Sequence, residues 1–161
     1  MVKLSWRRDV TEADIAAIEA LVQRTGFFTP AEVKMAGELV EARLTQGIES
    51  GYEFLVGEVN GVVAGYTCYG QIEGTESAFD LYWIAVDPTL QGGGIGRQVL
   101  QQTEIAMRAE GGSRYYAETS STDKYAPTRQ FYERAGFREV ARIADFYRPG
   151  DGKVIYEKLV L

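Results

Sequence analysis

The 161-residue sequence contains no histidine and only one cysteine. The absence of histidine excludes a Ser-His-Asp triad and most catalytic zinc sites, and we expect no metal cofactor. A general base would therefore be a carboxylate, a water molecule, or a lysine or tyrosine with a shifted pKa. The single cysteine, Cys68, has no internal disulfide partner, which predicts a reducing, cytoplasmic compartment. No histidine is present to activate Cys68, so we interpret it as a small apolar strand residue rather than a nucleophile.

Long hydrophobic runs and a net positive charge are also absent. No stretch approaches 18 apolar residues and the N-terminus lacks an apolar signal segment, so we expect neither a membrane span nor a secretory signal. The formal net charge of −6 argues against nucleic acid as the main partner. Residues 11–60 carry nine acidic and three basic side chains. These indicate either solvated helix faces or a surface that attracts a cationic substrate.

The length and the composition, 45% hydrophobic and 25% charged, predict one globular domain spanning residues 1–161. Helical periodicity and cap signals predict helices over 11–24, 29–44, about 96–110 and 126–136. Runs of apolar and β-branched residues predict strands over 4–10, 52–59, 62–72, 78–86, 113–120, 137–147 and 153–160.

Local signals define how several of these elements begin and connect. Thr11 with Asp14 resembles a capping box, and Thr29 precedes Pro30 at a helix start. The pair Asn60-Gly61 predicts a type I′ hairpin turn. Both faces of 78–86 are apolar, which is typical of a central strand, and the helix that follows it predicts one parallel pair in an otherwise antiparallel sheet.

Four glycines lie among residues 92–96, in the stretch "DPTLQGGGIGR" between the central strand and a helix. The first amides of a helix lack intrahelical acceptors and the helix dipole favours an anion there, so this loop predicts a phosphate or pyrophosphate site. A Walker A loop would need Lys-Ser/Thr after Gly96, and the third glycine of a dinucleotide fingerprint is missing. A simple tight turn is the alternative, although it would need fewer glycines.

The stretch "VDPTLQGGGIGRQVL" resembles the acyl-CoA motif Gln/Arg-x-x-Gly-x-Gly/Ala of the GNAT superfamily of N-acetyltransferases, with Gln91, Gly94 and Gly96 at the motif positions. The stretch "FYERAGF", Phe131 to Phe137, is similar to the short helix and following strand of that superfamily. Together with the two N-terminal helices and the terminal hairpin, the resemblance covers nearly the whole chain. It implies an α+β fold of three layers (α/β/α) with about four helices. The implied sheet is mixed and mostly antiparallel, with about seven strands and one splayed parallel pair.

The resemblance also implies where acetyl-CoA, the co-substrate, would bind. Backbone amides of the glycine loop would hold the pyrophosphate, and the end of the preceding strand would bind the pantetheine arm and the acetyl carbonyl. The pyrophosphate residues would be Gln91, Gly92, Gly93, Gly94, Ile95, Gly96 and Arg97, and the pantetheine residues Ile84, Ala85 and Val86. The asparagine that many members place before the short helix is missing, and Thr128 is the candidate substitute.

Two side chains are candidates for the chemistry that the resemblance implies. Tyr132 occupies the position of a tyrosine that protonates the leaving sulfur, and packing beside Phe131 and Phe137 is its alternative role. Glu118 matches a position where some members carry a general base, and its apolar neighbours could raise its pKa. A solvent-facing Glu118, with a water chain removing the proton, is the alternative.

We therefore expect an N-acetyltransferase that moves the acetyl group of acetyl-CoA to a primary amine of a small molecule, by direct attack in a ternary complex. A protein N-terminus or lysine as acceptor, or a non-catalytic acyl-CoA sensor, are the alternatives. The first two helices and the final hairpin should build the acceptor site, although core packing is the other role for their aromatic residues. The acceptor candidates are Phe27, Phe28, Tyr66, Tyr69, Asp145 and Tyr147. The sequence also leaves open whether the protein forms a homodimer.

Overall fold

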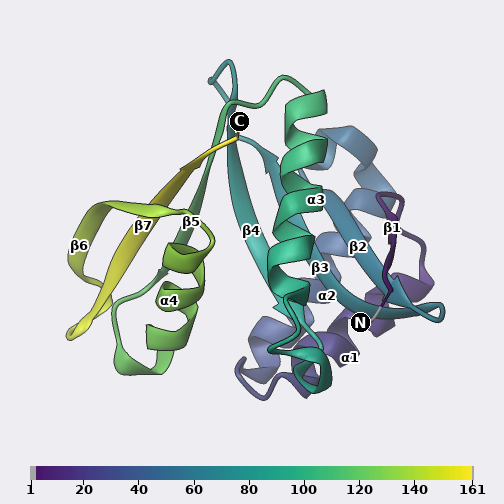
Figure 1. The fold of residues 1–161 in the computed structure, drawn as a ribbon, viewed down its shortest axis with the longest axis horizontal. Helices are drawn as coiled ribbons and strands as arrows, with labels where there is room; N and C mark the ends of the chain where they lie inside the picture. Colours follow the sequence, from purple (N-terminus) through teal and green to yellow (C-terminus); the bar gives the residue numbers. More distant parts are fainter. Residues whose placement is uncertain (1–2, 161) are drawn as a thin grey trace. The chain divides into compact units, whose positions relative to one another are not determined.

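The structure, a computed structural model, describes residues 3–160. Over these residues, seven strands form one sheet in the order β1-β2-β3-β4-β5-β7-β6, together with four α-helices (Figure 1). The strands are β1 (Ser5–Arg7), β2 (Glu53–Val59), β3 (Val62–Gln71), β4 (Ala78–Val86), β5 (Arg114–Ser120), β6 (Arg138–Arg148) and β7 (Asp151–Leu159). The α-helices are α1 (Ala13–Arg24), α2 (Pro30–Gln46), α3 (Ile95–Ala109) and α4 (Ala126–Arg134), and short 3-10 turns are η1 (Gly47–Ser50), η2 (Pro88–Leu90) and η3 (Asp123–Tyr125).

The sheet is mixed, as the sequence predicts. The parallel pairing joins Ala78–Leu81 of β4 to Arg114–Ala117 of β5, and the β1–β2, β2–β3, β5–β7 and β6–β7 pairs are antiparallel. The chain divides into two compact units, a first unit of Met1–Gly70 with Trp83–Ile105 and a second unit of Gln71–Tyr82 with Ala106–Leu161. The boundary falls inside β4 and α3. A single domain over residues 1–161 stays a prediction.

The core of the first unit lies between α1, α2 and the strands β2 and β3. Its buried members are Ile18, Leu21, Val22, Ala36, Val40, Phe54, Val56, Val63, Tyr66, Cys68 and Ala85. Cys68 is fully buried, which confirms its interpretation as an apolar strand residue. Helix α3 lies against the other face of β3, where the hydroxyls of Thr67 and Thr103 are 2.7 Å apart. In Figure 1, α3 lies on the near side of β2 and β3, and α1 and α2 lie behind them.

The helix starts in the first unit follow the local signals. At α2 the capping box is complete, because the Glu32 amide donates to the Thr29 hydroxyl at 3.2 Å and the Thr29 amide donates to the Glu32 carboxylate at 2.9 Å. At α1 only half of the predicted capping box forms, because the Asp14 carboxylate accepts the Thr11 amide at 2.7 Å. The helix itself begins at Ala13, two residues after Thr11. Both carboxylate oxygens of Asp14 also accept hydrogen bonds from the Arg7 guanidinium, at 2.6 and 2.8 Å.

The predicted turn at Asn60-Gly61 is confirmed. Both residues have positive φ, 53° and 78°, as a type I′ turn requires, and they connect β2 directly to β3. The final hairpin is tighter than the sequence predicts. Strand β6 continues to Arg148 and β7 begins at Asp151, because Pro149 and Gly150, with φ 83° at the glycine, suffice for the turn.

In the second unit, α4 covers one face of the β5–β7–β6 sheet through aromatic side chains. The ring of Tyr132 lies 5.1 Å from Phe137 and 5.8 Å from Tyr156, and Phe137 lies 4.8 Å from Tyr115. Tyr115 and Tyr156 are fully buried. This aromatic cluster holds the short helix against the sheet.

Candidate active site

The glycine loop, which we define as Gln91–Gly96, connects the 3-10 turn η2 to helix α3. Gly92 and Gly94 have φ values of 88° and 80°, in the left-handed region that costs other residues energy. A side-chain Cβ at either glycine would have no heavy atom within 4 Å. The glycines therefore serve the backbone conformation and an open approach to the amides, and they do not relieve a clash within the protein.

The loop presents backbone N–H groups to solvent at a helix N-terminus. The Gly94 carbonyl accepts the Gln98 amide at 3.0 Å, so Gly94 is the cap residue and the amides of the first turn have no intrahelical acceptor. Residues 91–94 are exposed, whereas the next residue, Ile95, is buried and anchors the helix. The first turn of α3 contains no acidic side chain. A glycine-rich turn with two left-handed residues at this positive helix end fits the oxygens of a phosphate group.

Hydrogen bonds fix the segment that leads into this loop. The Asp87 amide donates to the Ala64 carbonyl at 2.8 Å, and the Asp87 carboxylate accepts the amide and the hydroxyl of Thr89 at 2.9 and 2.7 Å. The Gln91 side chain donates back to the Val86 carbonyl at 3.4 Å. The hydrogen bonds from Thr89, with smaller contributions from Arg24, together outweigh the effect of burial and hold the pKa of Asp87 below its usual range. Asp87 is therefore a charged anchor of the loop.

The predicted pantetheine residues Ile84, Ala85 and Val86 form the end of β4, directly before this anchor. Ala85 is buried and packs near Gly65 of β3, while Ile84 and Val86 are partly exposed. The structure thus places the predicted pantetheine strand and the predicted pyrophosphate loop in one continuous segment of the first unit.

Tyr132 lies on α4 in the second unit, with 6% of its surface exposed. Burial raises the pKa of its phenol well above the ordinary value, so the hydroxyl stays protonated at neutral pH. The ring packs in the aromatic cluster against Phe131, Phe137 and Tyr156. Packing and proton donation are both compatible with this position, because the ring serves the first and the hydroxyl the second.

Glu118 does not have the apolar surroundings that the sequence predicts. Its side chain is 45% exposed and its carboxylate lies 2.7 Å from the Lys153 ammonium of β7. Its neighbours in sequence, Ala117 and Thr119, point to the opposite face of β5, where they are buried. This exposed position corresponds to the alternative that the sequence left open for Glu118, and its role as a general base stays a prediction.

Sequence reasoning missed Asp80, a carboxylate near the start of β4. Asp80 is half-buried and lies opposite Tyr116 in the parallel register. Burial raises its pKa, the Glu118 carboxylate raises it further, and Lys153 acts in the opposite direction. The signal available in the sequence was a single acidic residue inside an otherwise apolar central strand. Asp80 joins Glu118 as a candidate proton acceptor.

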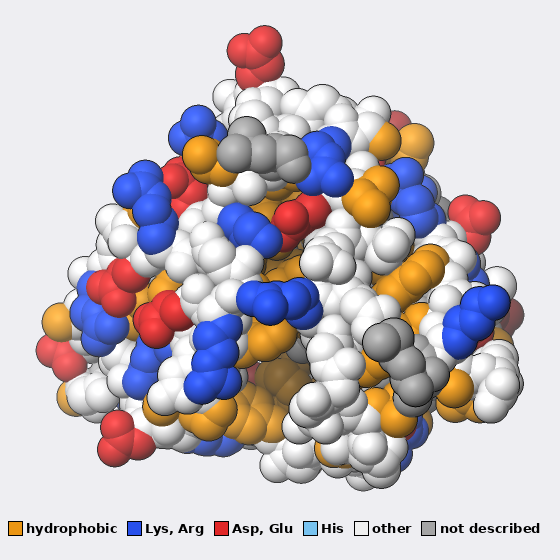
Figure 2. All heavy atoms as spheres, viewed as in Figure 1, with side chains coloured by type: hydrophobic (Ala, Val, Ile, Leu, Met, Phe, Trp, Pro, Cys, Tyr) orange, Lys and Arg blue, Asp and Glu red, His pale blue; other side chains and the backbone are white. Residues whose placement is uncertain are grey.

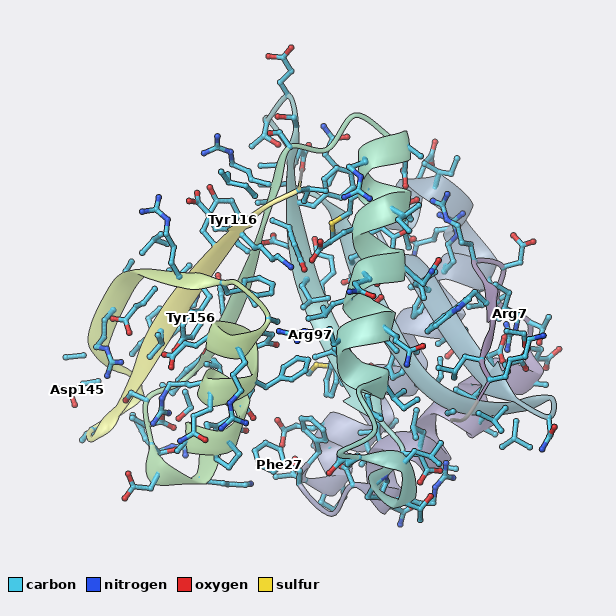
Figure 3. All side chains as sticks on the ribbon, viewed as in Figure 1. Arg7, Phe27, Arg97, Tyr116, Asp145 and Tyr156 are labelled. Atoms are coloured by element: carbon cyan, nitrogen blue, oxygen red, sulfur yellow. The ribbon has the colours of Figure 1, made fainter. Side chains whose placement is uncertain are left out.

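The aromatic acceptor candidates of the first unit divide into two groups. Tyr66 and Tyr69 are buried, with 1% and 0% of their surfaces exposed, so their core role is the one that the structure shows. Phe27 and Phe28 are partly exposed in the loop between α1 and α2, where Figure 3 labels Phe27. The Phe28 ring lies 4.9 Å from Trp83 of β4. These two side chains remain available to a ligand.

The remaining candidates lie in the second unit. Asp145 is exposed near the β6–β7 turn (Figure 3), with φ 56°, and accepts the Gly150 amide at 2.7 Å. Its carboxylate therefore serves the turn. Tyr147 is 45% exposed on β6, and burial of part of its ring raises the pKa of its phenol. Thr128 is partly exposed in the first turn of α4, which contains no acidic side chain.

The surface charge is mixed on the face that Figure 2 shows, where basic and acidic side chains alternate with apolar ones. In the described part of the chain, no group of three or more Cys, Asp or Glu residues is arranged to hold a metal ion. None of the helices within residues 3–160 combines the length and apolarity needed to cross a membrane.

Comparison with known proteins identifies the fold and the loop with one family. The sequence profile of the acetyltransferase (GNAT) family matches residues 12–137. A crystal structure of a GNAT-family protein from Desulfovibrio desulfuricans is 45% identical, with a TM-score of 0.95, covering 99% of this chain and 100% of that one. No curated protein sequence matches the chain.

More distant structures share the fold. The ribosomal-protein-S18-alanine N-acetyltransferase from Escherichia coli has a TM-score of 0.75 at 21% identity, covering 98% of this chain and 94% of that one. The aminoglycoside 6′-N-acetyltransferase from Enterococcus faecium has a TM-score of 0.76 at 15% identity, covering 99% and 97%. The yncA protein from Salmonella typhimurium, solved with its cofactor acetyl-CoA, has a TM-score of 0.71 at 23% identity, covering 98% and 94%.

Proposed function

Because the chain belongs to the GNAT family of acetyltransferases, we propose that it transfers the acetyl group of acetyl-CoA to a primary amine of a small molecule. The transfer is direct, from donor to acceptor in a ternary complex. Cys68, the sole cysteine, is fully buried in the core of the first unit and is unsuited to carry a covalent acetyl intermediate.

The glycine loop supports this proposal most directly. Its open amides at the start of α3 fit the pyrophosphate of CoA, and the absence of acidic side chains from the first turn of α3 leaves the positive helix end uncompensated. Gln91 to Arg97 would bind the pyrophosphate, and backbone groups of Ile84 to Val86 would hold the pantetheine and the acetyl carbonyl. Thr128 is a further candidate contact to CoA.

In the reaction, the neutral amine nitrogen attacks the thioester carbon, the C–S bond breaks and an amide forms. The leaving thiolate takes the proton of the Tyr132 hydroxyl, which is protonated at neutral pH, and the resulting tyrosinate regains a proton from solvent before the next turnover. The protonated amine gives up its proton to Glu118 or Asp80, or to a water molecule. A backbone amide at the end of β4 would stabilise the oxyanion, a contribution typically worth about 3 kcal/mol of the barrier.

Phe27 and Phe28 are the candidate acceptor contacts of the first unit, and Tyr147 is a separate candidate in the second unit. Among proteins of the same fold, one acts on aminoglycosides and another on a ribosomal protein, so small amines and protein N-termini are both tested below. A sensor that only binds acyl-CoA would need neither Tyr132 nor a base.

Binding is tested by thermal unfolding with acetyl-CoA, CoA and NAD in parallel. At a ligand concentration of about 100 times Kd, the stabilisation is roughly 2.7 kcal/mol, which corresponds to about 5–10 °C in Tm for a chain of this size. We expect a rise with both CoA species and none with NAD. An unchanged Tm with both CoA species would refute the donor assignment.

Catalysis is tested by thiol release from acetyl-CoA with a panel of primary amines and peptides. We expect Tyr132→Phe to lower kcat at least tenfold and to leave CoA affinity unchanged, because the ring and its packing are retained. Phe131→Leu, at the adjacent position on α4, is the matched control for packing. Equal kcat in Tyr132→Phe and wild type would refute the acid role, and CoA binding without any amine-dependent thiol release would favour the sensor alternative.

A further inference from the structure

The end of helix α1 is connected by an ion pair to the segment that carries the glycine loop. Arg24, in the last turn of α1, places a guanidinium nitrogen 3.1 Å from the Asp87 carboxylate, across 63 positions of sequence. The other carboxylate oxygen of Asp87 holds the amide and the hydroxyl of Thr89 in the turn before the loop. One carboxylate thus contacts both the end of α1 and the start of the loop.

The residues directly after Arg24 form the segment that we expect to contact the acceptor. The Thr25 hydroxyl donates to the Val22 carbonyl at 2.6 Å and accepts the Phe27 amide at 3.4 Å, and Gly26 turns the chain with φ 67°. The Phe28 ring then packs on Trp83 of β4 at 4.9 Å. We call residues 25–28 the aromatic loop.

The aromatic loop therefore has two attachments to the segment from β4 to the glycine loop. The first is the Arg24–Asp87 ion pair, whose side chains are 43% and 17% exposed, and the second is the Phe28–Trp83 contact. All these residues belong to the first unit. A phosphate group bound in the adjacent glycine loop would restrict the motion of Asp87. Through the ion pair, Arg24 and the residues that follow it would then become more ordered as well.

We propose that Arg24 is a positioning residue that couples the glycine loop to the aromatic loop, so that acyl-CoA binding orders the segment that receives the acceptor. The coupling is reciprocal, as linkage requires, so bound acceptor would strengthen CoA binding by the same factor by which bound CoA strengthens acceptor binding. The inference rests on the proposed function, since it takes CoA as the ligand of the glycine loop.

Amide hydrogen exchange of the peptide containing Phe27 and Phe28 tests the coupling, with and without saturating CoA. Wild type should show several-fold slower exchange of this peptide when CoA is bound. In Arg24→Gln and in Asp87→Asn this protection should disappear, and CoA affinity should fall roughly threefold to fivefold. The asparagine oxygen can still accept the Thr89 amide, so Asp87→Asn removes the charge while the turn keeps its cap.

Three comparisons separate coupling from general destabilisation. Arg8→Gln, which breaks the Arg8–Glu53 pair of 3.2 Å in the same unit, should keep wild-type protection. Arg24→Lys should restore part of it, and the double variant should lose no more than either single variant. Wild-type protection in Arg24→Gln would overturn the inference while leaving the proposed function intact. Absence of CoA binding to wild type would overturn both.

Discussion

The backbone conformation of the glycine loop leads to a quantitative prediction for three neighbouring glycines. Gly92 and Gly94 lie at φ 88° and 80°, whereas Gly93 lies outside the left-handed region. An alanine held at such positive φ costs roughly 1–2 kcal/mol. Replacing glycine by alanine also restricts the unfolded chain, which returns about 0.4–1 kcal/mol. We therefore expect Gly94→Ala, and likewise Gly92→Ala, to lower the free energy of unfolding by about 1 kcal/mol.

Gly93→Ala is the matched control. Its Cβ would lie 3.4 Å from the Leu90 carbonyl oxygen, near the lower limit of ordinary contacts, so the entropic gain should leave the free energy of unfolding unchanged or higher by about 0.5 kcal/mol. The difference between Gly94→Ala and Gly93→Ala is then about 1.5 kcal/mol, measurable as a shift of the urea midpoint at constant m-value.

The same variants separate backbone strain from ligand binding. If the loop of Gly94→Ala relaxes by turning one amide away from the phosphate, a charge-assisted hydrogen bond worth about 1.5–3 kcal/mol is lost. CoA affinity should then fall at least about tenfold, as measured by calorimetry. Gly93→Ala should keep wild-type affinity. Equal destabilisation of Gly93→Ala and Gly94→Ala, or a neutral Gly94→Ala in both assays, would refute the reasoning from the left-handed conformation.

Three further predictions concern buried or paired polar groups. Tyr66→Phe should leave the free energy of unfolding unchanged or raise it by about 1 kcal/mol in urea titrations, because the buried Tyr66 hydroxyl has no hydrogen-bond partner within residues 3–160; a clear loss would contradict this. Burial disfavours the charged form of Asp14, but the hydrogen bonds with Arg7 and Thr11 outweigh that effect and lower the pKa of the carboxyl. The contribution of Asp14 to the free energy of unfolding is therefore fully present above the unfolded pKa of about 3.9 and is lost as the pH falls through the lower, folded pKa. Asp14→Asn should thus cost about 2 kcal/mol at pH 7 and progressively less below about pH 4, and a pH-independent difference would oppose this account. If Asp80 is the general base, Asp80→Asn should shift the acidic limb of the pH–rate profile, and Glu118→Gln is the comparison variant. An unchanged acidic limb in both variants would indicate that a water chain removes the proton.

The sequence by itself determined the features that depend on local backbone conformation. The cap at Thr29, the turn at Asn60-Gly61 and the glycine loop each follow from what a few consecutive residues can adopt, and the structure contains all three. The parallel β4–β5 pair was also predictable, because a helix must separate two adjacent parallel strands. The family resemblance rests on the same local segments.

Only the tertiary structure decided which side chains meet and which are buried. Asp80 lies near Glu118 and Lys153 because the β4–β5 and β5–β7 registers bring three strands together, and no local pattern encodes a register. The alternation of side chains along β5 leaves Glu118 exposed, and packing in the core buries Tyr69. Arg24 and Asp87 are 63 positions apart in the sequence, and over such a separation the chain alone does not determine whether two side chains meet. Local preferences thus determine the elements, while packing between them determines the environment of each candidate group.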